Sequence, residues 1–503
     1  MMKTWKRIIA AFLLAPMIGM GISGAFRATV SASPIPLRGV VEGFYGHPWT
    51  QAERLDMIRF CSRHGMNAYL YAPKDDPYHR KDWRKPYPAK KLAELGELAK
   101  VAREQNVRFI FAVSPGLDLR FTGKEAEADR QAMLQKMESI YRLGVRDFAI
   151  FFDDIEHEDA IRQAEFLNWL QEAFIETHAD ASPLLTVPTE YSLDKMMEGD
   201  GRVHSYTEDF YRYLNQKILV LYTGNRVVGP SLSDEDYSRA VGICNRSLGI
   251  WWNYPVTDFK IEKLALGPIE NLPVNAEIPA LFYNPMEYPE LSKITLATGA
   301  DYARDPANYH ADASWRRAIQ EQYGELSDDM HAFAKQSTHL ENHWANAGRQ
   351  DGEHLRQAMD AFWESWPYYP DAMQHWETLH REFTDLQASL RQLEKGLPER
   401  AKRESKHQRK QLERIVRTDL RCLEMLRARR EHKSTDEIYG MFQEIEHERH
   451  AIHRNEHKAL ISEDAACKFI DDCQEFMTGN KTHQEGRFVP CGTAQLLKEI
   501  RQE

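Results

Sequence analysis

The chain has 503 residues, of which 42% are hydrophobic and 28% are charged, and its mean hydropathy is −0.60. These values are typical of a soluble protein with a sizeable core and two or three domains. The net charge of −11 and the pI of about 6.0 give no indication of a nucleic-acid partner.

The N-terminal segment has the three parts of a secretory signal peptide. Basic residues come first (Lys3, Lys6 and Arg7), the apolar stretch 8–22 follows, and Val30-Ser31-Ala32 is a suitable cleavage site. The apolar stretch is too short to span a bilayer comfortably. We therefore expect residues 1–32 to be a cleaved signal peptide and the mature chain to be secreted, without stable insertion into a membrane. An uncleaved membrane anchor is the alternative.

Residues 33–308 alternate short apolar, β-rich segments with amphipathic helical segments such as 89–104 and 129–143. The expected strands are residues 39–42, 67–72, 108–113, 148–152, 184–187, 218–222, 249–252 and 280–283. Eight strands that alternate with helices over this length are typical of a (β/α)₈ barrel. A doubly wound sheet is the competing fold, but no Gly-rich phosphate loop follows the first strand. We predict an α/β fold in which residues 33–308 form a TIM barrel.

The fourth expected strand ends in two adjacent carboxylates. The apolar run 148–152 leads directly into Asp153 and Asp154. Adjacent carboxylates titrate as a coupled pair, so their proton affinities are pushed apart and they can supply one acid and one base at the same pH. The alternative is structural, with Asp154 as the N-cap of a helix that starts near residue 157. Two carboxylates behind a buried strand favour catalysis.

The other strands are also followed by polar and aromatic residues, and the C-terminal ends of barrel strands meet at one face. That composition fits a sugar, because pyranose rings stack on aromatic faces and their hydroxyls bond to amides, carboxylates and ammonium groups. Candidates for the apolar surface are Tyr45, Tyr191, Trp251 and Trp252, and candidates for the hydrogen bonds are Lys74, Asn253, Asp258 and Asn284. Each aromatic residue could instead belong to the core, and Asp75 and Asp76 could hold Lys74 in a surface ion pair.

Several of these segments resemble motifs of glycoside hydrolase family 84, which contains the protein O-GlcNAcases and the bacterial N-acetylglucosaminidases once called hyaluronidases. The segments are residues 39–49 (GVVEGFYGHPW), 69–76 (YLYAPKDD), 152–156 (FDDIE), 188–191 (PTEY) and 251–258 (WWNYPVTD). The resemblance covers roughly residues 37–300, with the motifs in order.

The resemblance implies a mechanism and a role for each matching residue. The family cleaves β-linked N-acetylglucosamine with retention and uses the substrate's own acetamido oxygen as the nucleophile. Carried over, Asp154 is the general acid/base, Asp153 polarises the acetamide N–H, and Tyr191 bonds the oxazoline intermediate. Gly43, Lys74, Asp258 and Asn284 would bind sugar hydroxyls, and Trp251 and Asn253 would line the acetamide pocket. No metal ion or other cofactor is expected.

The resulting prediction is a retaining β-N-acetylglucosaminidase that removes terminal N-acetylglucosamine from a glycan or glycoprotein substrate. An endo-acting hyaluronidase is the alternative within the same class. A non-catalytic glycan-binding barrel is the alternative from another class.

Residues 309–503 are expected to form an all-α helical domain, with long helices over 371–395, 399–432 and 435–459. The last of these contains His447, His450, His453 and His457. They lie among glutamates, so a solvated charged face is favoured over a metal site.

The cysteines are divided between the halves of the chain, with Cys61 and Cys244 in the first and Cys422, Cys467, Cys473 and Cys491 in the second. Export allows disulfides, and we expect any pairing to occur within each half.

Overall fold

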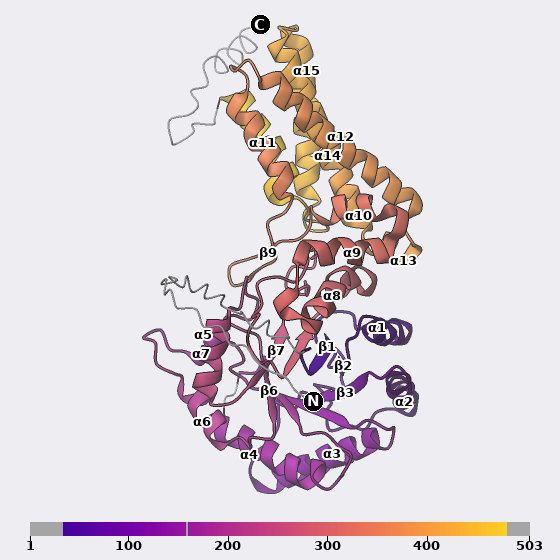
Figure 1. Ribbon diagram of the computed structural model, residues 1–503, viewed down its shortest axis with the longest axis vertical. Helices are drawn as coiled ribbons and strands as arrows, with labels where there is room; N and C mark the ends of the chain where they lie inside the picture. The colour runs from indigo at the N-terminus through magenta and orange to yellow at the C-terminus, as the bar shows by residue number, and fades with distance from the viewer. Residues whose placement is uncertain (1–33, 157–158, 480–503) are drawn as a thin grey trace, which may run out of the picture. The chain divides into compact units, whose positions relative to one another are not determined.

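The computed structural model describes residues 34–156 and 159–479, so the expected signal peptide lies outside the described residues. Eight parallel strands form a closed barrel in chain order (Figure 1). They are β1 (Leu37–Glu42), β2 (Ala68–Tyr71), β3 (Arg108–Val113), β4 (Asp147–Phe151), β5 (Leu185–Val187), β6 (Leu219–Tyr222), β7 (Leu248–Trp252) and β8 (Ala280–Tyr283). Pairing of β1 with β8, Gly39 opposite Phe282, closes the ring. The predicted TIM barrel is confirmed.

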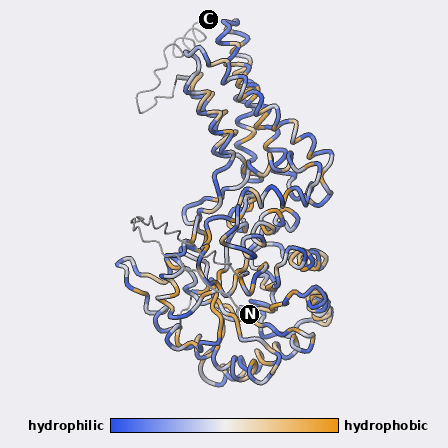
Figure 2. Tube along the Cα trace, in the orientation of Figure 1, coloured by the Kyte–Doolittle hydropathy of each residue, from blue (hydrophilic) through white to orange (hydrophobic). Residues whose placement is uncertain are grey.

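Side chains of the strands alternate between the barrel interior and the surrounding layer of helices. In β4, Ala149 and Phe151 belong to the interior core, whereas Phe148 and Ile150 belong to the outer core. Because parallel strands of a barrel are buried on both faces, they are continuous apolar runs in the sequence. Figure 2 shows hydrophobic residues concentrated along the strands.

Helices surround the barrel on its outer face (Figure 1). They are α1 (Gln51–Arg63), α2 (Ala89–Glu104), α3 (Gly123–Tyr141), α4 (Ala160–Leu170), α5 (Leu193–Met196), α6 (Ser205–Tyr213), α7 (Asp234–Cys244) and α8 (Pro289–Arg304). The N-cap of α4 is Asp159, whose carboxylate accepts a hydrogen bond from the backbone N of Arg162 at 3.1 Å. The alternative in which Asp154 caps this helix is therefore wrong, because the cap position lies at Asp159.

The residues after α8 are mostly helical. The elements are α9 (Ala311–Tyr323), α10 (Ser327–Ala334), β9 (Leu340–Glu341), β10 (Asn346–Ala347), α11 (Glu353–Ser365), α12 (Ala372–Gly396), α13 (Glu399–Glu404), α14 (Lys406–Arg430), α15 (Thr435–Arg454), η4 (Glu463–Cys467) and α16 (Lys468–Thr478). Helices α11, α12, α14, α15 and α16 pack on one another and are called the helical bundle below. In the described residues no helix is both long and apolar enough to cross a bilayer.

The helix expected over residues 399–432 is two helices, α13 and α14, which are separated at Ser405. The Ser405 hydroxyl donates to the carbonyl oxygen of Ala401 at 2.7 Å and accepts from the Arg409 side chain at 2.9 Å. A serine hydroxyl that bonds to the backbone in this way competes with the regular helical ladder.

The five cysteines that the structure describes, Cys61, Cys244, Cys422, Cys467 and Cys473, are free thiols. The expected pairing is therefore wrong for Cys61 and Cys244, which lie on separate helices of the barrel, α1 and α7. In the second half, Cys422 on α14 lies beside Cys473 on α16 and shares a hydrogen bond with it, but no disulfide joins them.

Gly39 in β1 lies where the strand passes very close to β2. A Cβ at this position would lie 1.9 Å from the carbonyl oxygen of Ala68, which is a backbone atom and cannot swing aside. We expect Gly39→Ala to lower the free energy of unfolding by about 3 kcal/mol or more, since overpacking costs about 1–3 kcal/mol even where neighbours can shift. Urea unfolding measures this change.

Gly242 provides the matched control, because it lies in helix α7 and an added Cβ would have no atom within 4 Å. We expect Gly242→Ala to raise the free energy of unfolding by about 0.5–1 kcal/mol. Equal stability of the two variants would contradict the packing argument.

Candidate active site

One cavity lies where the interior face of the barrel continues past the strand ends. The interior side chains Val41, Ala72, Phe151, Leu221, Trp251 and Phe282 are each followed, two residues later, by a residue that lines this cavity. Those residues are Gly43, Lys74, Asp153, Thr223, Asn253 and Asn284. The cavity is thus the next layer of the barrel interior, at the C-terminal face where TIM-barrel sites lie. Its volume is about 380 Å³.

The structure brings together the nine residues to which the family resemblance assigns a role. The remaining ones, Asp154, Tyr191, Trp251 and Asp258, also line the cavity. Their individual roles stay predictions.

Asp153 is held on one of its two oxygens only. Its Oδ2 forms an ion pair with the Nζ of Lys74, and the two side chains are 9% and 2% exposed. Its Oδ1 is buried and has no hydrogen-bond partner among the described residues. Because buried polar atoms are nearly always hydrogen-bonded, this oxygen is a natural acceptor for a donor on a ligand.

Lys74 does not form the surface ion pair that its neighbours in sequence suggested. Asp75 accepts from the backbone N of Gly46 at 2.7 Å, and Asp76 accepts from the Tyr71 hydroxyl at 2.7 Å. Lys74 therefore belongs to the cavity.

Asp154 has a left-handed backbone with φ of 55°, which costs a non-glycine residue about 1–3 kcal/mol. Its Oδ1 accepts from the Tyr191 hydroxyl at 2.7 Å, and its Oδ2 accepts from the Tyr45 hydroxyl at 2.8 Å. Burial raises the pKa of Asp154, but Lys74 and the two hydroxyls outweigh it and hold the pKa below its ordinary value. Asp154 is therefore a carboxylate in this state of the site.

Tyr45 connects the acidic residues of the site. Its backbone N donates to Asp258 Oδ2 at 2.9 Å, and its hydroxyl donates to Asp154. Arg80 donates to the Tyr45 hydroxyl and, at 2.9 Å, to the carbonyl oxygen of Asp154. Burial is the main cause that raises the pKa of Asp258, and the Tyr45 N–H partly opposes it.

A chain of amide hydrogen bonds lines the opposite strands of the barrel. Asn284 accepts from the backbone N of Gly43 at 3.3 Å and donates to Asn253 Oδ1 at 3.0 Å. The same oxygen of Asn253 accepts from the indole N–H of Trp251 at 2.9 Å. The ring of Trp251 occupies the space beside Gly43, where a Cβ would lie 2.2 Å from it. These contacts fix the Trp251 ring in one place on the cavity wall.

Part of the cavity wall comes from loops that the sequence did not predict. Trp344, in the β9–β10 hairpin, and Phe259 both line the cavity, and their ring centres are 4.9 Å apart. Trp252 was a candidate for the sugar surface with the core as its alternative, and for this residue the structure supports the core. Trp252 belongs to the outer core, because strand alternation turns it away from the interior face that Trp251 occupies.

Of the histidines expected on one helix, His453 on α15 takes part in an ion pair, and His457, which follows α15, contacts the carbonyl oxygen of Arg454 at 2.9 Å. His453 Nδ1 lies 2.6 Å from Glu456 Oε1. In the ranges that the structure covers, 34–156 and 159–479, no three His, Cys, Asp or Glu side chains are arranged to hold a metal ion.

Comparisons with known proteins agree with this architecture. A family model described as beta-N-acetylglucosaminidase matches residues 38–335, and a model described as hyaluronidase post-catalytic domain-like matches residues 354–470. The protein O-GlcNAcases of Rattus norvegicus and Mus musculus are 33% identical to this chain over 244 residues. That stretch is 46% of this chain and 26% of each relative, so the chain matches about a quarter of the length of these relatives.

Solved structures are similar over most of the chain. The structure of CpGH84B is 38% identical with a TM-score of 0.81, over 88% of this chain and 77% of that one. An O-GlcNAc hydrolase mutant of Thermobaculum terrenum has a TM-score of 0.78 at 23% identity, over 88% and 95% of the two chains, which is a likeness of fold alone. Since the first family model covers more than half of the sequence, this chain belongs to the beta-N-acetylglucosaminidase family, the glycoside hydrolase family 84 that its motifs resemble.

Proposed function

We propose that this chain removes terminal β-linked N-acetylglucosamine from a glycan or glycoprotein, with retention, by substrate-assisted catalysis. Membership of the family supports the reaction class. One observation carries the mechanism: Asp153 and Asp154 face the same cavity but have separate partners. Asp153 has one oxygen paired with Lys74 and the other without a donor in residues 34–156 and 159–479, whereas both oxygens of Asp154 accept from tyrosines.

In the first step the substrate's acetamido oxygen attacks the anomeric carbon while the glycosidic C–O bond breaks. Asp154 gives its proton to the leaving oxygen. Oδ1 of Asp153 accepts a hydrogen bond from the acetamide N–H, which becomes more acidic as positive charge develops on the forming oxazoline ring. In the second step Asp154 takes a proton from water, whose oxygen attacks the anomeric carbon and reopens the ring. Two displacements give net retention.

The protonation of Asp154 depends on its two tyrosine partners. The hydroxyls of Tyr45 and Tyr191 stabilise the carboxylate, but the first step requires the acid form. A bound sugar excludes water from the carboxyl group, and a hydroxyl that turns toward the sugar no longer donates to Asp154. Both changes raise the pKa of Asp154 and favour the form that the first step needs.

The size of the cavity favours this proposal over an endo-acting hyaluronidase. A volume of about 380 Å³ is at the small end of the range for ligand pockets and suits one terminal sugar better than the interior of a long polysaccharide. A barrel that only binds glycans would not need two adjacent carboxylates with different hydrogen-bond partners.

Two variants separate the roles of Asp153 and Asp154. Their activity is measured by phenol release from aryl N-acetyl-β-glucosaminides. We expect Asp153→Asn to lower kcat by about 100-fold or more for every leaving group, because attack by the acetamide accompanies each departure. We expect Asp154→Ala to slow poor leaving groups far more than activated ones, since only the former need a proton.

Asp159→Asn is the matched control, because asparagine caps a helix as well as aspartate does. It should leave kcat and KM at their wild-type values. Equal losses across leaving groups for Asp154→Ala would contradict its role as the acid. A folded wild type without any turnover would favour the glycan-binding barrel or a longer substrate.

Removal of the Tyr45 hydroxyl should shift the pH profile. Tyr45→Phe deletes a donor to the Asp154 carboxylate, so the pKa of Asp154 rises. The acid form is required for the first step, and the rate falls as the pH rises through this pKa. We therefore expect the falling limb of kcat/KM against pH to move to higher pH. Tyr213→Phe, on the exposed side of α6, is the control and should leave the profile unchanged. An unmoved limb in Tyr45→Phe would rule out this coupling.

We also propose that the chain is exported, from its basic start, apolar stretch 8–22 and small residues at Ser31 and Ala32. Mass spectrometry of the protein from a bacterial host should give a mature N-terminus near Ser33. A full-length chain in the membrane fraction would instead support the uncleaved anchor.

A further inference from the structure

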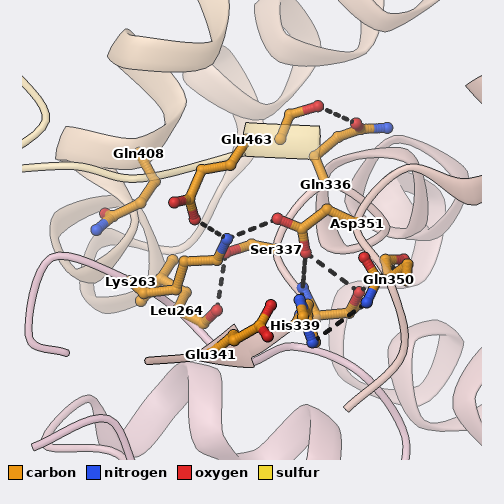
Figure 3. A network of polar contacts seen from close by, with 12 residues as sticks. Lys263, Leu264, Gln336, Ser337, His339, Glu341, Gln350, Asp351, Gln408 and Glu463 are labelled. Atoms are coloured by element: carbon orange, nitrogen blue, oxygen red, sulfur yellow. Dashed lines mark hydrogen bonds and ion pairs between the residues drawn. The ribbon is translucent and has the colours of Figure 1, made fainter. Parts of the chain in front are cut away.

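Lys263 is a buried cation in the segment between β7 and β8. Its side chain is 2% exposed, and its Nζ donates to Asp351 Oδ2 at 2.6 Å and also to Glu463 (Figure 3). Burial lowers the pKa of Lys263, but the two carboxylates outweigh it and raise the pKa above its ordinary value. The ion triad therefore joins the loop after β7 to the segment after β10 and to η4.

The Asp351 carboxylate fixes the base of the β9–β10 hairpin. Its Oδ1 accepts from the backbone N of Thr338 at 2.8 Å and of His339 at 2.9 Å, directly before β9. The hairpin carries Trp344 to the cavity wall, against Phe259. Asp351 thus uses one oxygen for the hairpin and the other for Lys263.

Segments beside Glu463 fasten the helical bundle to the same loop. The carbonyl oxygen of Glu262 accepts from the backbone N of Leu460 at 2.9 Å and from the Gln408 side chain at 3.0 Å. Gln408 lies on α14, and Leu460 follows α15. The position of the loop therefore depends on residues far along the chain.

This loop leads directly to the cavity. Turn hydrogen bonds of 2.9 Å connect Lys263 N to the Lys260 carbonyl and Lys260 N to the Thr257 carbonyl, next to Asp258. The Lys260 side chain donates to the carbonyl oxygen of Glu341 in β9 at 3.1 Å. Lys263 is thus connected by hydrogen bonds both to the turn before Asp258 and to the hairpin.

We propose that Lys263 is a positioning residue for sugar binding, which holds Asp258 and Trp344 at fixed places on the cavity wall by clamping the loop, the hairpin and the helical bundle together. The inference rests on the proposed function, in which Asp258 bonds sugar hydroxyls. Those bonds exist in the ground state and in the transition state alike, so their loss raises KM and leaves kcat unchanged. A triad that served only stability would change neither constant.

The test is Lys263→Met in the full chain, with an aryl N-acetyl-β-glucosaminide as the substrate. We expect KM to rise about tenfold while kcat stays within about twofold of wild type. Lys293→Met is the matched control, since Lys293 is also a buried lysine between two carboxylates, Asp56 and Glu290, each at 2.7 Å, and it does not line the cavity. It should lower the melting temperature in the same way and leave KM unchanged.

A milder variant covers the case in which Lys263→Met does not fold. Glu463 is 34% exposed, so Glu463→Gln leaves no deeply buried charge unpaired, and KM should rise about threefold. When Lys263→Met and Glu463→Gln are combined, their effects on KM should be less than additive, because both substitutions break the same ion triad.

Hydrogen exchange provides a readout that does not depend on turnover. In Lys263→Met, amides of residues 258–263 and 338–347 should exchange faster than in Lys293→Met. An active wild type with unchanged KM in folded Lys263→Met and Glu463→Gln would overturn the positioning role and leave the proposed function intact. An inactive wild type would instead overturn the proposed function, and unchanged exchange in both segments would overturn the clamp.

Discussion

Two carboxylates that are neighbours in sequence must face one cavity, and the site is built around that constraint. Along an extended strand, neighbouring side chains point to opposite faces. Asp153 continues the interior face that Ala149 and Phe151 occupy, so the same path would turn Asp154 toward the outer helices. The strand ends at Phe151, and the left-handed backbone of Asp154 returns its carboxylate to the cavity. Hydrogen bonds from Tyr45, Tyr191 and Arg80 offset the strain of that conformation.

Most of the barrel was predictable because its strands are buried on both faces. Each strand is then an apolar run bounded by polar residues, and observed strand bounds differ from the predicted ones by at most two residues. The ends of the helices were harder to predict than the ends of the strands. Asp154 and Asp159 are both chemically suitable caps, and only the length of the loop after β4 decides between them. Likewise, local sequence does not show that Ser405 divides a long helical segment, since a single serine lowers helix propensity only slightly.

Site residues that come just after a barrel strand were predictable from the sequence. Site residues that come from other loops were not. In a barrel, the residues just after each strand must meet at one end. Lys74, Asn253 and Asn284 were expected in the cavity for this reason, and they line it. The alternation of interior side chains would also have identified Thr223 and excluded Trp252. Trp344 has no such signal, because it reaches the cavity from a hairpin beyond the barrel, whose base is bonded to Asp351.

The charges around the cavity suit a neutral sugar that becomes positive as it reacts. Asp153, Asp154 and Asp258 line the cavity, and Lys74 forms an ion pair with Asp153. Lys74 lies on the Oδ2 side of Asp153, so it orients that carboxylate and leaves Oδ1 for the substrate. In the proposed reaction, positive charge develops on the sugar ring and the oxazoline, within reach of fixed negative groups. Because those groups are already oriented, little reorganisation is needed when the charge appears, which is the main source of electrostatic catalysis in enclosed sites. The same arrangement gives a neutral ground state no comparable stabilisation, so its effect is concentrated on the transition state.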